Sequence, residues 1–189
     1  MHSLIRMLAR GTALLGGCVL LALVLMTTLS IIGRSVNKWL HTDTAQALLG
    51  DFTETLLGLG IGEINGNYEL LEAGVALAIF SFFPICQLNG SHATVDVFAS
   101  ALSERVNRAI RAFWEVCLTL ALILISWRLF GGVERYYTNG ETTLFLQFPV
   151  WWAYAASFAA SVVTCIVGVY CAVMRVGESL SGRHILPQG

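Results

Sequence analysis

Long uninterrupted runs of apolar residues dominate the chain, and four of them are long enough to cross a membrane. A helix of about 20 apolar residues spans the hydrocarbon core of a bilayer, which is about 30 Å thick. The pattern therefore predicts four transmembrane helices, at about residues 12–32, 68–88, 112–130 and 149–174. The third run is the least clean, because Glu115 and Arg128 lie inside it. Long side chains near the ends of a span can reach the headgroups, so the run still predicts a span.

The first apolar run could also be the core of a secretory signal peptide, because Arg6 and Arg10 precede it. It is longer than the usual signal core of about 7 to 15 residues. It ends in Ile31-Ile32-Gly33-Arg34, which offers no cleavage site of small residues. We therefore interpret it as a transmembrane helix.

Two segments between the spans have an amphipathic pattern. In residues 94–111 the apolar positions recur every three or four residues while charged residues occupy the other faces, which predicts an interfacial helix on the cytoplasmic side. The alternative, that this segment is simply the start of the third transmembrane helix, stays open. The first external loop, residues 34–67, has a weaker pattern that predicts a short surface helix, followed by glycines that do not match a dinucleotide-binding fingerprint.

Composition and charge support a membrane protein and suggest its orientation. Hydrophobic residues make up 56% of the chain and charged residues 12%, with a mean hydropathy of +0.71; soluble domains carry about 25% charged residues. The net charge of −1 argues against a nucleic-acid partner. Lysines and arginines favour cytoplasmic loops. Cytoplasmic termini place Arg6, Arg10, Arg105, Arg108, Arg111, Arg175 and Arg183 inside, against Arg34, Lys38, Arg128 and Arg135 outside.

The cysteines and histidines indicate no cofactor, and no feature predicts an enzyme. All five cysteines fall within the predicted spans, so neither a disulfide framework nor a zinc site is expected. All four histidines lie outside the spans, which argues against a membrane haem or a redox subunit. A tetraspanin-like organiser would carry cysteines in its external loops, and the predicted external loops of this chain have none. A self-sufficient exporter would place an ionisable residue in mid-membrane, and the centres of these spans have none.

Seven residues are candidates for structural or partner contacts. Arg34 ends the first span and Glu69 and Glu72 begin the second, so all three should lie near the external face, where Arg34 could pair with either carboxylate; the alternative is that both carboxylates are solvated at a helix start. The four-residue spacing of His92 and Asp96 favours a cap or a hydrogen-bonded pair over a metal site. Trp151 and Tyr154 open the fourth span as an interfacial aromatic belt.

The order of these features resembles the small membrane subunit of the tripartite ATP-independent periplasmic (TRAP) transporters, the DctQ-like family. The resemblance covers residues 14–174 and rests on four short motifs at span boundaries. They are Gly33-Arg34, the pair Glu69 and Glu72, Gly90-Ser91-His92-Ala93-Thr94-Val95-Asp96, and Phe148-Pro149-Val150-Trp151-Trp152-Ala153-Tyr154. The first external loop departs from the family by being longer and richer in glycine.

The resemblance implies an all-α integral membrane protein of a single membrane domain in the bacterial inner membrane. It implies a scaffold subunit that braces a large membrane subunit, which carries organic acids and sodium ions, and that helps to dock a periplasmic substrate-binding protein. Membrane lipids are the remaining expected partner. The alternative is an anchor or structural subunit of another inner-membrane complex.

Overall fold

In the computed structural model, which describes residues 2–42, 62, 64–90 and 103–181, four long helices account for most of the chain. They are α1 (His2–Leu40), α4 (Asn67–Asn89), α5 (Glu104–Asn139) and α6 (Val150–Ser181). All four are long and apolar enough to cross a membrane. The predicted fold class, an all-α protein with four membrane-spanning helices, is therefore confirmed.

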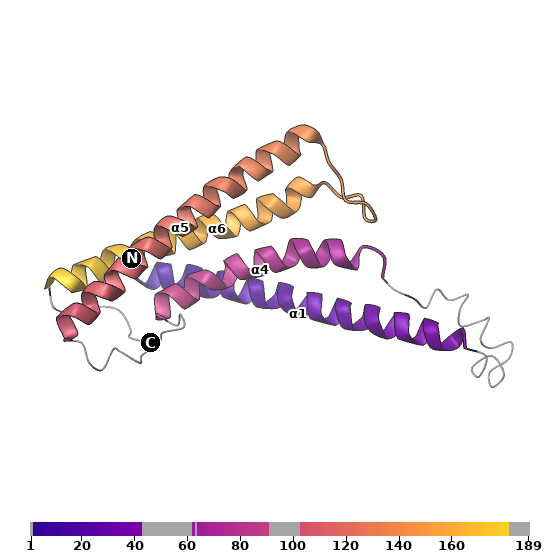
Figure 1. The fold of residues 1–189 in the computed structure, drawn as a ribbon, viewed down its shortest axis with the longest axis horizontal. Helices are drawn as coiled ribbons and strands as arrows, with labels where there is room; N and C mark the ends of the chain where they lie inside the picture. Colours follow the sequence, from indigo (N-terminus) through magenta and orange to yellow (C-terminus); the bar gives the residue numbers. More distant parts are fainter. Residues whose placement is uncertain (1, 43–61, 63, 91–102, 182–189) are drawn as a thin grey trace.

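The helices form two hairpins, α1 with α4 and α5 with α6, which are inclined to each other and diverge toward the end that carries the α5–α6 loop (Figure 1). Helix α6 is central, because it packs against α5, α4 and α1. Accordingly, 44% of its most apolar stretch is buried, against 17% in each of the other three helices. The outward faces of the other three helices are therefore available to lipid or to a partner.

The hairpins are joined at the end that holds the N-terminus. Ile5 and Ala9 of α1 meet Leu88 of α4 and Val167 and Cys171 of α6 in a buried apolar cluster. Lipid tails are as apolar as these side chains, so the cluster is stabilised by close van der Waals packing between the helices and not by the removal of apolar surface from water. This cluster fixes the start of α1 against the end of α6.

The α1–α4 contact depends on small residues. A Cβ on Gly16 would lie only 2.7 Å from Ser81 Cβ and 3.3 Å from the carbonyl oxygen of Ala78, so the two backbones approach closely there. Small residues at helix crossings allow this approach in membrane proteins. The two helices of the first hairpin are thus closest at the crossing of Gly16 with Ala78 and Ser81.

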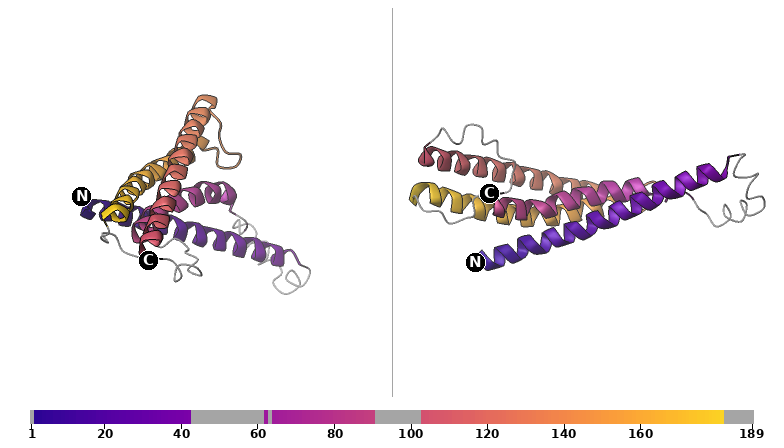
Figure 2. Two further views of the ribbon diagram at one scale, coloured as in Figure 1. Left: turned by 60° about the vertical axis from the view of Figure 1, so that its left-hand side comes forward. Right: turned by 90° about the horizontal axis from the view of Figure 1, so that it is seen from below.

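Two helices extend well beyond the predicted spans. Helix α1 has 39 residues and α5 has 36, about 58 and 54 Å at 1.5 Å per residue, so both exceed the hydrocarbon core. Helix α1 runs past the start of α4, as Figure 2 shows. Residues 34–40 of the predicted external loop are therefore helical, whereas the predicted short surface helix near residues 48–59 lies outside the described residues.

The predicted interfacial helix is not confirmed as a separate element. Residues 104–111 form the first turns of α5, continuous with the third span, as in the alternative interpretation. Residues 94–102 lie outside the described part of the chain.

Candidate partner-binding surface at the loop end

A short structured loop joins α5 to α6. Thr142 and Pro149 form an isolated antiparallel bridge, and the amide of Thr143 donates to the carbonyl of Phe148 at 3.0 Å. The tip of the loop presents two apolar side chains, Leu144 and Phe145, which are 87% and 71% exposed. An apolar tip on an ordered loop is a feature of surfaces that contact lipid or another protein.

Glu69, in the first turn of α4, holds this loop. Its carboxylate oxygens accept hydrogen bonds from the backbone amides of Phe145 at 2.8 Å and Leu146 at 3.0 Å. Gly66, just before α4, has a positive φ of 81°, and any Cβ there would overlap the side chain of Leu146. The loop of the second hairpin is therefore attached to the start of the first hairpin's returning helix, at the end where the two hairpins diverge (Figure 1).

We expect Glu69→Ala to release the loop without unfolding the helices. The two amides lose a charged acceptor, so hydrogen–deuterium exchange of residues 143–147 should become several-fold faster. Glu141→Ala is the matched control, because the Glu141 carboxylate in the same loop accepts from the side chain of Asn139 rather than from the tip. Equal exchange at the tip in both variants would contradict the assignment.

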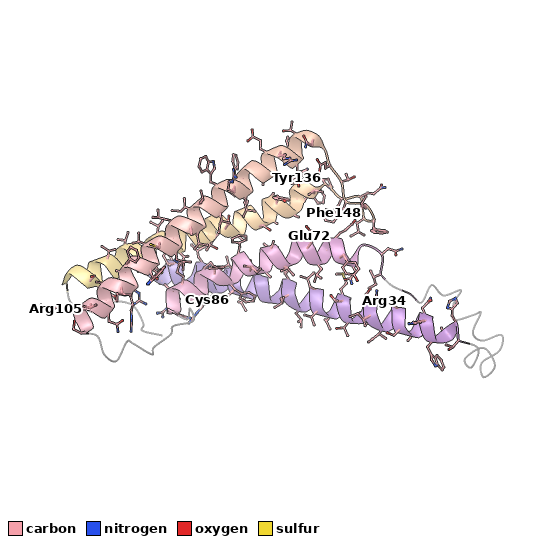
Figure 3. All side chains as sticks on the ribbon, in the orientation of Figure 1. Arg34, Glu72, Cys86, Arg105, Tyr136 and Phe148 are labelled. Carbon is pink, nitrogen blue, oxygen red and sulfur yellow. The ribbon has the colours of Figure 1, made fainter. Side chains whose placement is uncertain are left out.

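The predicted site residues have different outcomes. Arg34 and Glu72 lie toward the loop end of the molecule (Figure 3). Glu69 takes its hydrogen bonds from the α5–α6 loop, a partner that the sequence did not indicate. The pairing of Arg34 with Glu69 or Glu72 stays a prediction. His92 and Asp96 lie outside the described residues.

Trp151 and Tyr154 belong to an aromatic cluster between α5 and α6. The Trp151 ring lies edge-on to Tyr137 with 5.5 Å between centroids, and Tyr154 lies 4.7 Å from Tyr136. A Cβ on Gly132 would lie 2.7 Å from the Tyr154 ring, so the two helices also approach closely here. The aromatic residues of α6 thus contact α5 in addition to their predicted place at a membrane interface, which stays a prediction.

Sequence reasoning missed the polar contacts that join α4 to α6. Pro84 lies inside α4 and has no N–H to give to the carbonyl of Phe80, four residues earlier. The hydroxyl of Thr164 on α6, which is fully buried, donates to that carbonyl oxygen at 2.8 Å, and the carbonyl oxygen of Ala160 in its own helix lies within reach at 3.0 Å. A proline in the middle of an apolar span is the sequence signal that could have predicted such a donor.

A second buried contact joins three helices. Gln87 of α4 donates to the hydroxyl of Thr119 of α5 at 3.3 Å, and that hydroxyl donates to the carbonyl of Gly168 on α6 at 3.2 Å. Ser126 and Ser161 add a hydroxyl pair 2.9 Å apart between α5 and α6. These polar groups join the helices through hydrogen bonds, and the side-chain oxygen of Gln87 is buried beside them without a hydrogen-bond partner.

Two charged residues are buried in the bundle near its other end. Arg175 and Glu178 of α6 are buried and form an ion pair with 3.4 Å between guanidinium nitrogen and carboxylate oxygen. Among the described residues, no three histidine, cysteine, aspartate or glutamate side chains gather where they could hold a metal ion. The described polar and charged side chains therefore mainly connect helices to one another, and the loop end offers an exposed surface to a partner.

Comparison with known proteins gives the family. No curated protein and no solved structure matches the chain. The family model for the DctQ component of tripartite ATP-independent periplasmic transporters matches residues 59–177, which include α4, α5 and most of α6. Helix α1, and with it Gly33-Arg34, lies before the matched residues. The match covers well over half of the chain, and we conclude that this multi-pass membrane protein belongs to the DctQ component family of TRAP transporters.

Proposed function

We propose that the chain is the scaffold subunit of a sodium-coupled TRAP transporter that imports organic acids. In this proposal it braces the large membrane subunit, which carries the substrate and the sodium ions, and helps to dock the periplasmic binding protein. The family match over residues 59–177 is the observation that carries the proposal, since this family is one component of a three-part transporter.

The chemistry of the helix centres supports a scaffold rather than a carrier. Transport sites are built from broken helices and ionisable or unpaired polar groups near the midplane. Here the buried hydroxyls of Thr119, Thr164 and Ser161 are all engaged in contacts between helices. These three hydroxyls are therefore used in helix packing, which supports a scaffold.

The exposed apolar faces support a large membrane partner. Helix α5 exposes Phe113, Trp114, Leu120, Leu124 and Trp127, and α1 exposes a similar series along its length. In the membrane such faces contact either lipid tails or another helix bundle. The divergence of the two hairpins makes this surface broad, as a brace between subunits requires (Figure 2).

The proposed orientation places both termini in the cytoplasm of a bacterial cell and the α5–α6 loop on the periplasmic side of the inner membrane. The loop then lies where a periplasmic binding protein docks, with Leu144 and Phe145 at its tip. A membrane-impermeant maleimide should label Thr142→Cys from outside spheroplasts and leave Ser103→Cys unlabelled. The opposite labelling would reverse the orientation.

The proposal is tested by capture of the large subunit. The tagged chain is co-expressed with the large membrane subunit of a TRAP transporter from the same organism, and the complex is purified in mild detergent. We expect the two proteins to co-purify in a fixed ratio, and the untagged chain serves as the control. Purification of the tagged chain without the large protein would contradict the scaffold function.

A further inference from the structure

A surface pocket of about 560 Å³ lies between α5 and α6 near the loop end. Its walls are formed by Trp127, Arg128, Gly131, Gly132, Arg135, Tyr136 and Tyr154. Arg128 and Arg135 are seven residues apart, so they lie on one face of α5, about 10 Å apart along the axis. The size falls within the range of about 300 to 1,000 Å³ that is typical of small-molecule sites.

Both arginines of the pocket are available to an anion. No carboxylate among the described residues lies within ion-pair distance of Arg128 or Arg135. The guanidinium of Arg135 lies over the ring of Tyr136, 5.9 Å from its centroid, and that ring packs against Tyr154. No acidic residue is among those that line the pocket. Two guanidinium groups thus flank a pocket in which no acidic side chain competes.

The glycines of α5 leave the floor of the pocket open. A Cβ on Gly132 would touch the Tyr154 ring, whereas a Cβ on Gly131 would meet no atom within 4 Å. The space above Gly131 is therefore unfilled by protein. Trp127, 72% exposed on the same helix, extends the pocket with an apolar surface on the side away from the α5–α6 loop.

We propose that this pocket binds the headgroup of an anionic phospholipid in the leaflet on the side of the α5–α6 loop. Guanidinium groups bind phosphate with charged, often bidentate hydrogen bonds. Tyrosine and tryptophan prefer the level of the headgroups, where this pocket would lie. An acyl chain would follow the exposed surface beside Trp127. The proposal rests on the proposed membrane placement of α5, but it does not depend on the transport function.

The test is native mass spectrometry of the purified full chain, delipidated in detergent and titrated with phosphatidylglycerol. Gly131→Leu fills the pocket and keeps both charges, and Arg128→Gln combined with Arg135→Gln removes the charges and keeps the space. Gly11→Leu is the matched control, because Gly11 of α1 also has no atom within 4 Å of an added Cβ and lies outside the pocket. Circular dichroism and size-exclusion chromatography verify that each variant is folded.

We expect one tightly bound phosphatidylglycerol in the unchanged protein and in Gly11→Leu. Each pocket variant should bind it about tenfold more weakly or worse, because the arginine variant loses charged hydrogen bonds and Gly131→Leu occupies the space of the headgroup. Neutral phosphatidylcholine should bind weakly, and inorganic phosphate should not compete at millimolar concentration. Equal affinity for phosphatidylglycerol in the pocket variants and Gly11→Leu would overturn the proposal. So would equal binding of phosphatidylcholine, or occupation of the pocket by free phosphate. Failure to capture the large subunit would leave this result unaffected.

Discussion

Thr164→Val is expected to destabilise the helix bundle by about 1 to 2 kcal/mol, although it changes the shape of the side chain very little. The hydroxyl of Thr164 donates to the carbonyl of Phe80, which Pro84 deprives of its usual helical partner. Valine leaves this carbonyl in an apolar interior with no hydrogen-bond donor. A buried polar group without a partner destabilises the folded state by most of the free energy needed to desolvate it. Unfolding in sodium dodecyl sulfate, followed by tryptophan fluorescence, measures the change in free energy.

A double-mutant cycle identifies the cause of this loss. Pro84→Ala supplies the missing N–H, so Thr164→Val should cost much less in that background. Thr138→Val is the matched control, because Thr138 is exposed and its hydroxyl donates within its own helix to the carbonyl of Glu134. A Thr164→Val effect that is the same with proline or alanine at position 84 would show that the orphaned carbonyl is not responsible.

Gly16→Ala is expected to destabilise the first hairpin by about 1 to 3 kcal/mol, the usual cost of overpacking. The added methyl would lie 2.7 Å from Ser81 Cβ, which is attached to the backbone of α4 and cannot rotate away. Helices α1 and α4 must therefore separate along their crossing. The same unfolding measurement reports the change, and proximity labelling between the two helices reports their separation.

The neighbouring glycine is the control for this variant. A Cβ on Gly17 would have the ring of Phe82 as its nearest neighbour, at 4.0 Å, which is ordinary contact. Gly17→Ala should be neutral or slightly stabilising, because alanine is the better helix former. Equal losses from the two substitutions would show that the α1–α4 crossing is not closely packed at Gly16.

The four spans could be predicted because a long apolar run in lipid is stable only as a helix, which forms all of its backbone hydrogen bonds within itself. The ends of the helices could not, since α1 and α5 continue into charged stretches where the helix leaves the hydrocarbon core. For the same reason, residues 104–111 belong to α5 although their pattern is amphipathic. Periodicity gives the face of a helix, but it does not give the point at which the helix begins.

The contacts between segments that are distant in the sequence also could not be predicted. Glu69 was predicted to lie near the external face, but its partners are amides 76 and 77 residues away in the α5–α6 loop. Likewise, nothing local to Thr164 shows that it faces Phe80, 84 residues earlier. Such pairings depend on how the two hairpins are inclined, which single-helix patterns do not encode. Pro84 was the one local signal of a carbonyl that needs a donor.

Transport in proteoliposomes tests the scaffold function most directly. The large TRAP membrane subunit from the same organism is reconstituted with this chain and without it, and this chain is also reconstituted alone. Each preparation receives the periplasmic binding protein, a labelled organic acid and an inward sodium gradient. We predict uptake only when both membrane proteins are present. Uptake by this chain alone, or full uptake by the large protein without it, would contradict the account.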